Sequence, residues 1–308
     1  MSTKRTLQTR KGTITFPAYV PVTTFGTKYP LDDLIRPYLP RLAPAVMVSF
    51  FYAQQMKKEE APRIPMMVDS GGFASLFANA RVVDSGGLGI IELDKDEQVH
   101  VTNPFDVLEY QEQVADIAFT LDFPIPPGTE KEEANRRQQL TIANAIWAIG
   151  NRRRRDLPLY ACVQGWDGGS VRECAQAYKG LGFDGIAIGG LVPRSGDRKL
   201  IQEIVEAVRS EIDTLPLHVF GLGNPGMVEF LYMLGVDSVD SSSYVKLAAD
   251  GKLWGTRGKV ADPSPTTRLH LALSNLAYAT GYSLPLNGEH LRHFTSMVHP
   301  DQGSLPTI

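Results

Sequence analysis

Eight short apolar runs recur along the chain, and most of them end in a residue suited to chemistry rather than to packing. The runs occupy residues 18–24, 45–51, 64–69, 116–122, 157–164, 184–190, 216–223 and 236–240. Runs of this length, with β-branched residues inside and turn residues at the edges, predict buried parallel strands. Stretches with helical patterning separate most of them. The alternation predicts an α/β fold, a (β/α)8 TIM barrel, in which catalytic groups lie at the C-terminal ends of the strands.

The segments between the runs predict the remaining elements. The polar opening includes KGTITF at residues 11–16, which predicts a short hairpin that closes the bottom of the barrel. Residues 31–39 predict a poor helix because Pro37 interrupts it, and Asn103 or Thr102 is expected to cap a helix that begins at Pro104. Further helices are expected over residues 129–149, 170–181, 196–212, 225–234, 266–279 and 289–297. Residues 80–103 predict an irregular insertion, whose DSGG segment at 84–87 is expected to form a loop over the pocket.

Length and composition bound the number of domains. With 308 residues, of which 43% are apolar and 21% charged, the chain fits one large globular domain or two smaller ones. Because no low-complexity linker divides it, we expect a single barrel domain over residues 1–308, with residues 260–308 as a C-terminal helical extension.

Cysteine usage, hydropathy and charge predict the location of the protein and limit its expected partners. Two cysteines, Cys162 and Cys174, and a polar start without an apolar leader predict a cytoplasmic location. No apolar stretch reaches membrane-spanning length, so no membrane partner is expected. The net charge of −3 gives no overall attraction to nucleic acid, and the arginine run at 152–155 is expected to be a solvated helix end.

Asp69 ends the third run and begins the segment DSGGF. A carboxylate at a strand end can serve as an acid or a base. The following Ser70 and Gly71 form a loop whose backbone can approach a ligand closely, because glycine has no side chain. The alternative is a turn that only caps the next helix.

Asp122 and Gln164 end the fourth and fifth runs, and Gly189 and Gly190 end the sixth. The prolines after Asp122 stiffen its loop, and its carboxylate can accept two N–H bonds from a planar amidine-like edge. Gln164 offers both a donor and an acceptor, and the glycine amides are free to reach a carbonyl oxygen. Together these groups are complementary to guanine, although Asp122 can instead cap its local turn.

Asp240 ends the eighth run and Asp237 begins it. Side chains alternate along a strand, so only one of them faces the pocket readily, and we choose Asp240 because it is terminal. A carboxylate there can attack a sugar anomeric carbon and form a covalent glycosyl intermediate. Gly221, which ends the seventh run, adds a backbone amide, whereas His218 within that run is expected to be a satisfied core histidine.

The segments VDSGGF, LD after an apolar strand, CVQGW, DGIAIGGL, VFGLGNP and GVDSVDS follow one another in this order. Over about residues 65–258, including DGKLWGTRG, the chain resembles the tRNA-guanine transglycosylases. The resemblance implies that Asp240 is the nucleophile and Asp69 the acid and base, and that Asp122, Gln164 and Gly190 read guanine. It also implies exchange of guanine in a nucleic acid for a 7-deazaguanine through a covalent enzyme–nucleoside intermediate, without cofactor.

Two departures from the family limit what the resemblance implies. The family's structural zinc site has no counterpart, because no cysteine follows Cys174, so we expect no zinc subdomain and no metal. The segment after the nucleophile reads SSSYVKLAADGK, unlike that of the tRNA enzymes. The combination of a kept pocket and a different polynucleotide-reading segment resembles the DNA-modifying (DpdA) branch. We therefore favour DNA as the substrate, with tRNA as the alternative. Lys246, Lys252 and Arg257 are the expected phosphate contacts, or else ordinary surface charges.

Other functions stay open at this point. The chain can be a noncatalytic barrel subunit of such an enzyme, although it retains the three aspartates, or a barrel glycosidase or nucleosidase that acts on free nucleosides. The expected partners are a nucleic acid, DNA or tRNA, and a free 7-deazaguanine base. A homodimer is an open alternative.

Overall fold

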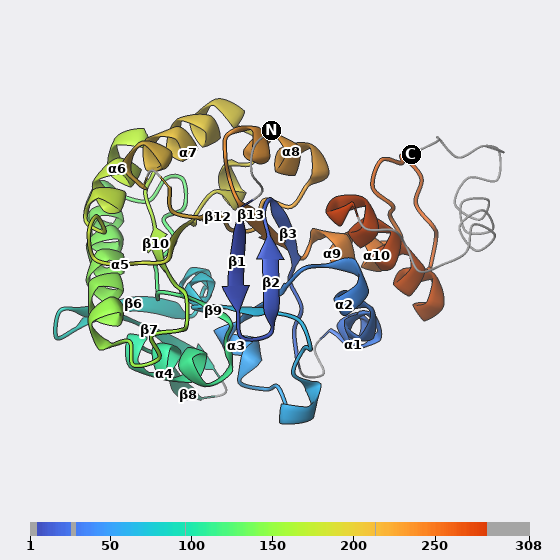
Figure 1. The fold of residues 1–308 in the computed structure, drawn as a ribbon, viewed down its shortest axis with the longest axis horizontal. Coiled ribbons are helices and arrows are strands. Elements are labelled where there is room, and N and C mark those ends of the chain that lie inside the picture. The colour runs from blue at the N-terminus through green and yellow to red at the C-terminus, as the bar shows by residue number, and fades with distance from the viewer. Residues whose placement is uncertain (1–4, 26–28, 96, 213, 282–308) are drawn as a thin grey trace.

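A parallel sheet that closes on itself forms the centre of the molecule (Figure 1). The computed structural model describes residues 5–25, 29–95, 97–212 and 214–281. Within these residues eight parallel strands follow the order β3-β13-β12-β11-β10-β9-β5-β4. They are β3 (Ala18–Pro21), β4 (Val46–Ser49), β5 (Met66–Asp69), β9 (Ile117–Phe119), β10 (Leu159–Val163), β11 (Gly185–Ile188), β12 (Leu217–Val219) and β13 (Ser238–Ser241). A parallel bridge between Val22 and Met47 joins β3 to β4, so the predicted (β/α)8 barrel is confirmed.

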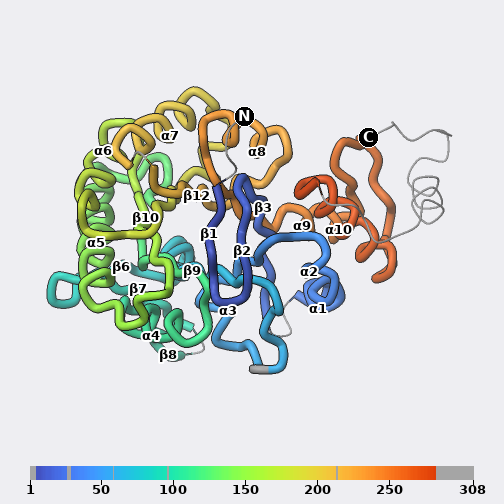
Figure 2. The backbone as a smooth tube through the Cα atoms, viewed as in Figure 1, coloured from blue at the N-terminus to red at the C-terminus, as the bar shows by residue number. Residues whose placement is uncertain are grey.

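Helices surround the barrel, and α5 to α7 lie across it from α9 and α10 (Figure 2). The helices are α1 (Pro30–Ile35), α2 (Leu39–Leu42), α3 (Phe50–Ala53), α4 (Pro104–Val114), α5 (Lys131–Asn151), α6 (Gly168–Gln176), α7 (Arg198–Ile212), α8 (Pro225–Met233), α9 (Ser243–Ala249) and α10 (Pro265–Thr280). Pro37 lies in a 3-10 turn between α1 and α2, which explains the expected break. The Asn103 side chain accepts the Asp106 N–H at 2.9 Å and caps α4 as expected. The helix expected at 289–297 lies outside the described residues.

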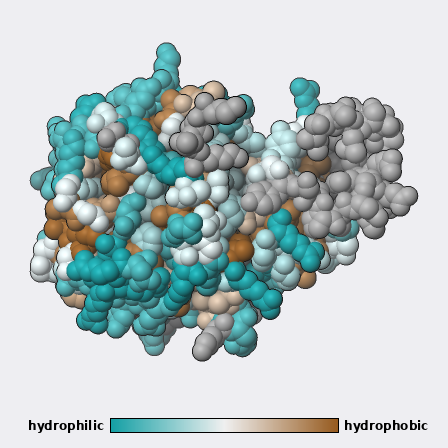
Figure 3. Space-filling view, viewed as in Figure 1, coloured by the Kyte–Doolittle hydropathy of each residue, from teal (hydrophilic) through white to brown (hydrophobic). Residues whose placement is uncertain are grey.

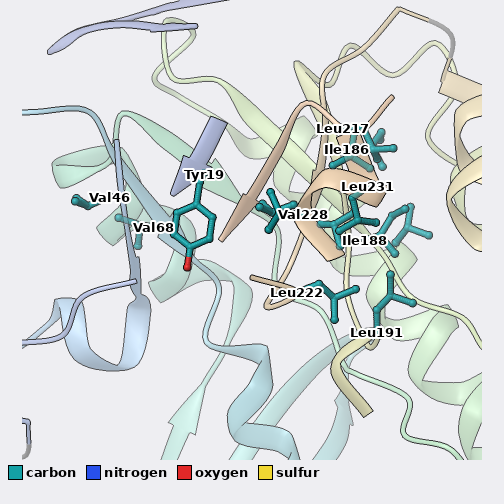
Figure 4. Packing of buried hydrophobic residues seen from close by; sticks show 14 of the residues in the cluster. Tyr19, Val46, Val68, Ile186, Ile188, Leu191, Leu217, Leu222, Val228 and Leu231 are labelled. Carbon is teal, nitrogen blue, oxygen red and sulfur yellow. The ribbon is translucent and has the colours of Figure 1, made fainter. Parts of the chain in front are cut away.

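Alternation along the strands divides the core into two layers. Residues such as Val46, Val68 and Leu217 point outward and pack under the helices (Figure 4). Their neighbours Met47 and Met67 point into the barrel. This two-sided burial explains why the strands read as continuous apolar runs.

The N-terminal segment closes one end of the barrel. Strands β1 (Thr6–Thr9) and β2 (Gly12–Thr15) form the expected antiparallel hairpin, which lies in front of the barrel in Figure 1. Ile14 of the hairpin and Phe16 are buried among the inward-facing side chains, together with Phe119 and Tyr160. Apolar side chains therefore fill the barrel between the hairpin and the opposite end.

The expectation of an irregular insertion at 80–103 is wrong. Strands β6 (Ala80–Ser85), β7 (Leu88–Lys95) and β8 (Gln98–Thr102) form an antiparallel sheet. The segment 84–87 is its first hairpin turn, in which Gly86 and Gly87 have φ of 65° and 88° and Asp84 Oδ1 accepts the Gly87 N–H at 2.8 Å. Positive φ favours glycine, so the two glycines of this DSGG segment are explained by the hairpin turn that they form. One face of the sheet, with Val82 and Ile91, packs on the barrel beside Phe123, Leu121 and Leu140.

One expectation about the surface also changes with the structure. The arginine run is not simply a solvated helix end, because Arg152 is buried, pairs with Asp184 and donates to Leu157 O at 2.9 Å. Arg154 also donates to the backbone oxygens of Glu112 and Ala115.

The face drawn in Figure 3 shows hydrophobic residues in small groups among hydrophilic ones. Helix α10 buries Leu271, Leu273 and Leu276 in the outer core layer of the barrel. Among the described residues, no helix is long and apolar enough to cross a membrane.

Candidate active site

Three aspartates lie at the end of the barrel that faces away from the hairpin. Asp69 is the last residue of β5, Asp240 lies near the end of β13, and Asp122 follows β9 by three residues. The charges of Asp122 and Asp240 both raise the pKa of Asp69, so both of these carboxylates lie within electrostatic reach of Asp69. Asp237 precedes β13 and pairs instead with Arg5 at 3.0 Å and with Arg209.

The pKa of Asp69 is raised to about 7, from an ordinary value of 3.8. Burial is the largest cause, because it disfavours the charged carboxylate, and the neighbouring charges of Asp122 and Asp240 add to it. Hydrogen bonds from the backbone at Gly71 and Ser70 lower the pKa in part. Asp69 therefore titrates near neutral pH and can give or take a proton there.

The carboxylate of Asp122 is held from two sides. Ser70 Oγ donates to Oδ1 at 2.9 Å, and Gln164 Nε2 donates to Oδ2 at 2.5 Å. Burial raises the pKa of Asp122, and these two hydrogen bonds lower it in part. Gly72 leaves room for this arrangement, since a Cβ there would lie 2.2 Å from the Asp122 carbonyl oxygen. Each carboxylate oxygen keeps a lone pair for a ligand N–H.

Helix α5 holds the chain on both sides of Asp122. Thr141 Oγ1 accepts the Phe123 N–H at 3.1 Å, and Asn144 Nδ2 donates to Leu121 O at 3.2 Å. Asn144 also exchanges two hydrogen bonds with the backbone of Gly89, at 2.9 and 3.0 Å. The β6–β8 sheet is thus tied to the same helix and supports the Asp122 loop.

Gln164 follows β10 directly and is fully buried. Its backbone oxygen accepts from Gln138 Nε2 at 2.7 Å, and its side-chain Oε1 has no hydrogen-bond partner among the described residues. An unpartnered buried acceptor is costly, so this oxygen is available to a ligand donor.

The two glycines after β11 differ from each other. The expectation that both amides are free is wrong for Gly189, whose N–H donates to Val163 O at 3.1 Å as part of the sheet. A Cβ on Gly189 would lie 2.1 Å from Gln164 Nε2, so the glycine makes room for that side chain. Gly190 has φ of 72°, and its carbonyl accepts from Arg194 Nη1 at 2.6 Å. Arg194, which is buried and also donates to Ile125 O at 2.9 Å, did not stand out in the sequence.

Asp240 lies in a polar cluster inside the barrel. Its Oδ1 lies 3.0 Å from His218 Nε2 and accepts the Gly221 N–H at 3.1 Å. The Gly221 amide therefore binds the aspartate, rather than being free for substrate as expected. His218 is a buried and hydrogen-bonded core histidine as expected, but its contact with Asp240 was missed. The signal lies in the alternation, because His218 is paired in register with Ser238, two residues before Asp240 on the same face.

The residues do not fit the structural zinc site of the family. Cys162 lies in β10 and Cys174 in α6, and both are buried. Within the described ranges, no three His, Cys, Asp or Glu side chains are grouped so that they could hold a metal ion. Folding without zinc stays a prediction.

The expected phosphate contacts lie on the surface after β13. Lys246 of α9, Lys252 and Arg257 are exposed, and Lys252 Nζ lies 3.8 Å from Asp250 Oδ2. Their contact with nucleic acid stays a prediction.

The chain resembles known proteins over most of its length. The family model described as queuine tRNA-ribosyltransferase matches residues 49–286. The tRNA-guanine(15) transglycosylase of Methanothermobacter thermautotrophicus is 27% identical over 82% of this chain and 37% of the relative. The Methanosphaera stadtmanae enzyme is 27% identical over 85% of this chain and 36% of the relative. The Pyrococcus furiosus enzyme is 31% identical over 57% of this chain and 30% of the relative. The chain thus spans about a third of the length of these curated relatives.

Proposed function

Because the chain belongs to the queuine tRNA-ribosyltransferase family, we propose that it is a guanine transglycosylase, a pentosyltransferase that replaces a guanine of tRNA with a 7-deazaguanine base. The observation that carries this proposal is the gathering of Asp240, Asp69 and the Asp122–Gln164 pair at one end of the barrel. A nucleophile, a proton carrier and a base-reading pair are the three parts that base exchange requires.

The relatives support tRNA as the substrate, whereas the sequence alone had favoured DNA. Their names describe a tRNA-guanine(15) transglycosylase, and guanine 15 of tRNA is therefore the first target to test. The divergent segment after β13 suggested DNA, but the relatives that match this chain are named for tRNA.

The Asp122–Gln164 pair reads the base in this proposal. The free lone pairs of Asp122 accept the N1–H and the 2-amino group of guanine, and Gln164 Oε1 accepts a further N–H. The Gly190 amide, without a hydrogen-bond partner in the described part of the chain, donates to the O6 atom of the base. Adenine has an amino group where guanine has O6 and no hydrogen at N1, so it leaves these buried groups unpaired and is rejected.

The exchange then takes two displacements. Asp240 attacks C1′ of the ribose, a C–O bond forms, and the bond from C1′ to N9 breaks with its electron pair on the guanine. Asp69, protonated in a fraction of molecules at pH 7, gives the leaving guanine a proton. The incoming base returns a proton to Asp69 and attacks C1′, which releases the Asp240 carboxylate. No bond energy has to be supplied, because one glycosidic bond replaces another.

Incubation of the full chain with labelled guanine and tRNA tests the proposal. We expect label in tRNA but not in single-stranded or duplex DNA, and a covalent protein–tRNA adduct that survives denaturation. A tRNA with adenine at position 15 is the matched substrate control, and Asp240→Asn is the matched protein control, since its amide keeps the shape but cannot act as the nucleophile. Label in DNA alone, or with Asp240→Asn, would contradict the proposal.

The same assay separates the other functions. Release of free guanine from nucleosides, without incorporation, would indicate a nucleosidase. Binding of tRNA without an adduct or label would indicate a noncatalytic subunit.

A further inference from the structure

The carboxylate of Asp240 is held asymmetrically. Both of its hydrogen-bond partners in the described part of the chain, His218 Nε2 and the Gly221 N–H, lie at Oδ1. The second oxygen, Oδ2, has none there. Asp240 retains some exposure, since 10% of its side-chain surface is accessible, whereas His218 has none.

The contacts of His218 assign its ring protons. An ionised carboxylate only accepts, so the hydrogen of the imidazole must be on Nε2, where it faces Asp240. In the neutral ring Nδ1 is then an acceptor, and the Ser238 hydroxyl at 2.8 Å donates to it. Ser238 and His218 are both buried, with 1% and 0% of their surfaces exposed, so exchange of these hydrogen bonds for water is disfavoured.

The ring cannot turn away easily. His218 packs against Phe119 and Phe220, with ring centroids 5.2 and 4.8 Å apart. Phe119 lies among the same inward-facing side chains, and Ser238 is paired in register with His218, so the imidazole has aromatic rings beside it and polar groups at both nitrogens.

We propose that Ser238 and His218 are positioning residues that make Oδ2 of Asp240 the attacking oxygen. The inference rests on the proposed transglycosylase function. The two N–H groups engage the lone pairs of Oδ1 and fix the plane of the carboxylate, and Oδ2 keeps its electron pair for the anomeric carbon. Neither side chain has to touch the substrate, because both act through Asp240. A displacement of about 1 Å in a reacting group can cost about 100-fold in rate.

Two substitutions at position 218 separate positioning from packing. His218→Leu fills the buried site with an apolar side chain and removes the donor to Oδ1. His218→Gln places an amide nitrogen close to the position of Nε2 and can still donate. We expect the single-turnover rate of adduct formation with tRNA to fall about 100-fold in His218→Leu and to recover to within about tenfold of the wild type in His218→Gln.

Measurements beside the rate complete the test. The dissociation constant for guanine, measured by calorimetry, should stay within about twofold in both variants, because the base contacts the Asp122–Gln164 pair. Ser238→Ala, which frees the ring to adopt the other tautomer, should slow adduct formation by an amount between those of the two His218 variants. It keeps the proposal testable if His218→Leu does not fold.

The outcomes are distinguishable. A wild-type chain that forms no adduct with tRNA or DNA refutes the proposed function and this inference with it. An active wild type with unchanged rates in His218→Leu and Ser238→Ala refutes the inference alone. Equal losses of rate, guanine affinity and thermal stability in both His218 variants would show a merely structural role and also refute it.

Discussion

The carboxylates of Asp69, Asp122 and Asp240 share one end of the barrel, yet each has different neighbours. Asp122 accepts hydrogen bonds from a hydroxyl and a side-chain amide, and Asp240 is bonded to a histidine and a backbone amide. Asp69 is buried, accepts from backbone N–H groups, and faces the charges of the other two. Residues of one type can thus serve as a base reader, a nucleophile and a proton carrier, because their surroundings differ.

At Asp69 the raised pKa predicts a pH-dependent stability difference. A folded-state pKa of about 7 against an ordinary 3.8 means that the folded chain holds this proton more tightly than the unfolded chain. The resulting stabilisation is complete below about pH 4 and is lost as the pH rises through 7.

The variant Asp69→Asn has no proton to lose at this position. Its free energy of unfolding should therefore rise relative to wild type between pH 5 and pH 8, by a few kcal/mol at about 1.4 kcal/mol per pKa unit. Urea denaturation at several pH values measures the difference, with the exposed turn variant Asp84→Asn as control. Parallel pH profiles for Asp69→Asn and wild type would show that the carboxylate is not destabilised by burial.

At Asp122 the substitution Asp122→Asn tests base reading. It keeps the shape but replaces one acceptor oxygen with a donor, so a guanine N–H loses its partner at a cost of about 1–3 kcal/mol. Guanine should bind about 10- to 100-fold more weakly, as calorimetry can measure. Asp84→Asn again serves as the control, and equal affinity in wild type and Asp122→Asn would remove Asp122 from the base-reading role.

At the level of elements, the β6–β8 sheet supports the base-reading loop. A Cβ on Gly89 would lie 2.2 Å from the Phe123 ring, next to Asp122. Gly89→Ala should displace Phe123 and so weaken guanine binding as well as stability, although Gly89 is not placed in the pocket. Gly150→Ala, in α5 with open space around the new Cβ, is the matched control and should leave both unchanged or slightly raise stability.

Guanine titration and thermal unfolding of the two variants measure these effects. A loss of stability in Gly89→Ala with full guanine affinity would mean that the sheet stabilises the barrel without positioning Asp122.

The strands were predictable from the sequence because burial on both faces leaves a local apolar signal. The β6–β8 sheet was not predictable in the same way. Strand β8 is almost fully exposed and β7 buries only alternate residues, so neither has the continuous apolar pattern of the barrel strands. Helix ends with a proline or a capping side chain, such as Asn103, were also predictable from neighbouring residues.

The placement of the aspartates followed from strand ends, whereas their partners depended on contacts distant in sequence. His218 reaches Asp240 only through the pairing of β12 with β13, and the Gly189 amide is used by β10. Such pairings combine residues far apart in the chain, and no local pattern reports them.

At the scale of the whole molecule, the net charge of −3 means that only local basic groups can attract a polynucleotide. If Lys246, Lys252 and Arg257 contact phosphates, neutralising each should weaken tRNA binding and reduce the slope of log affinity against log salt by roughly one unit. Binding measured between low and high salt tests this, with Lys131→Gln at the start of α5 as a control for total charge. A triple variant that binds as the wild type does would move the tRNA path elsewhere.

In the described part of the chain, the hairpin of β1 and β2 and the apolar side chains inside the barrel close the site of the three aspartates from the hairpin end. The leaving guanine and the incoming base must then use the same opening one after the other, because guanine occupies the base-reading site that the incoming base needs. Turnover should follow ping-pong kinetics, in which guanine dissociates before its replacement binds. Initial rates at varied tRNA and base concentrations would give parallel double-reciprocal lines, whereas intersecting lines would require room for both bases at once.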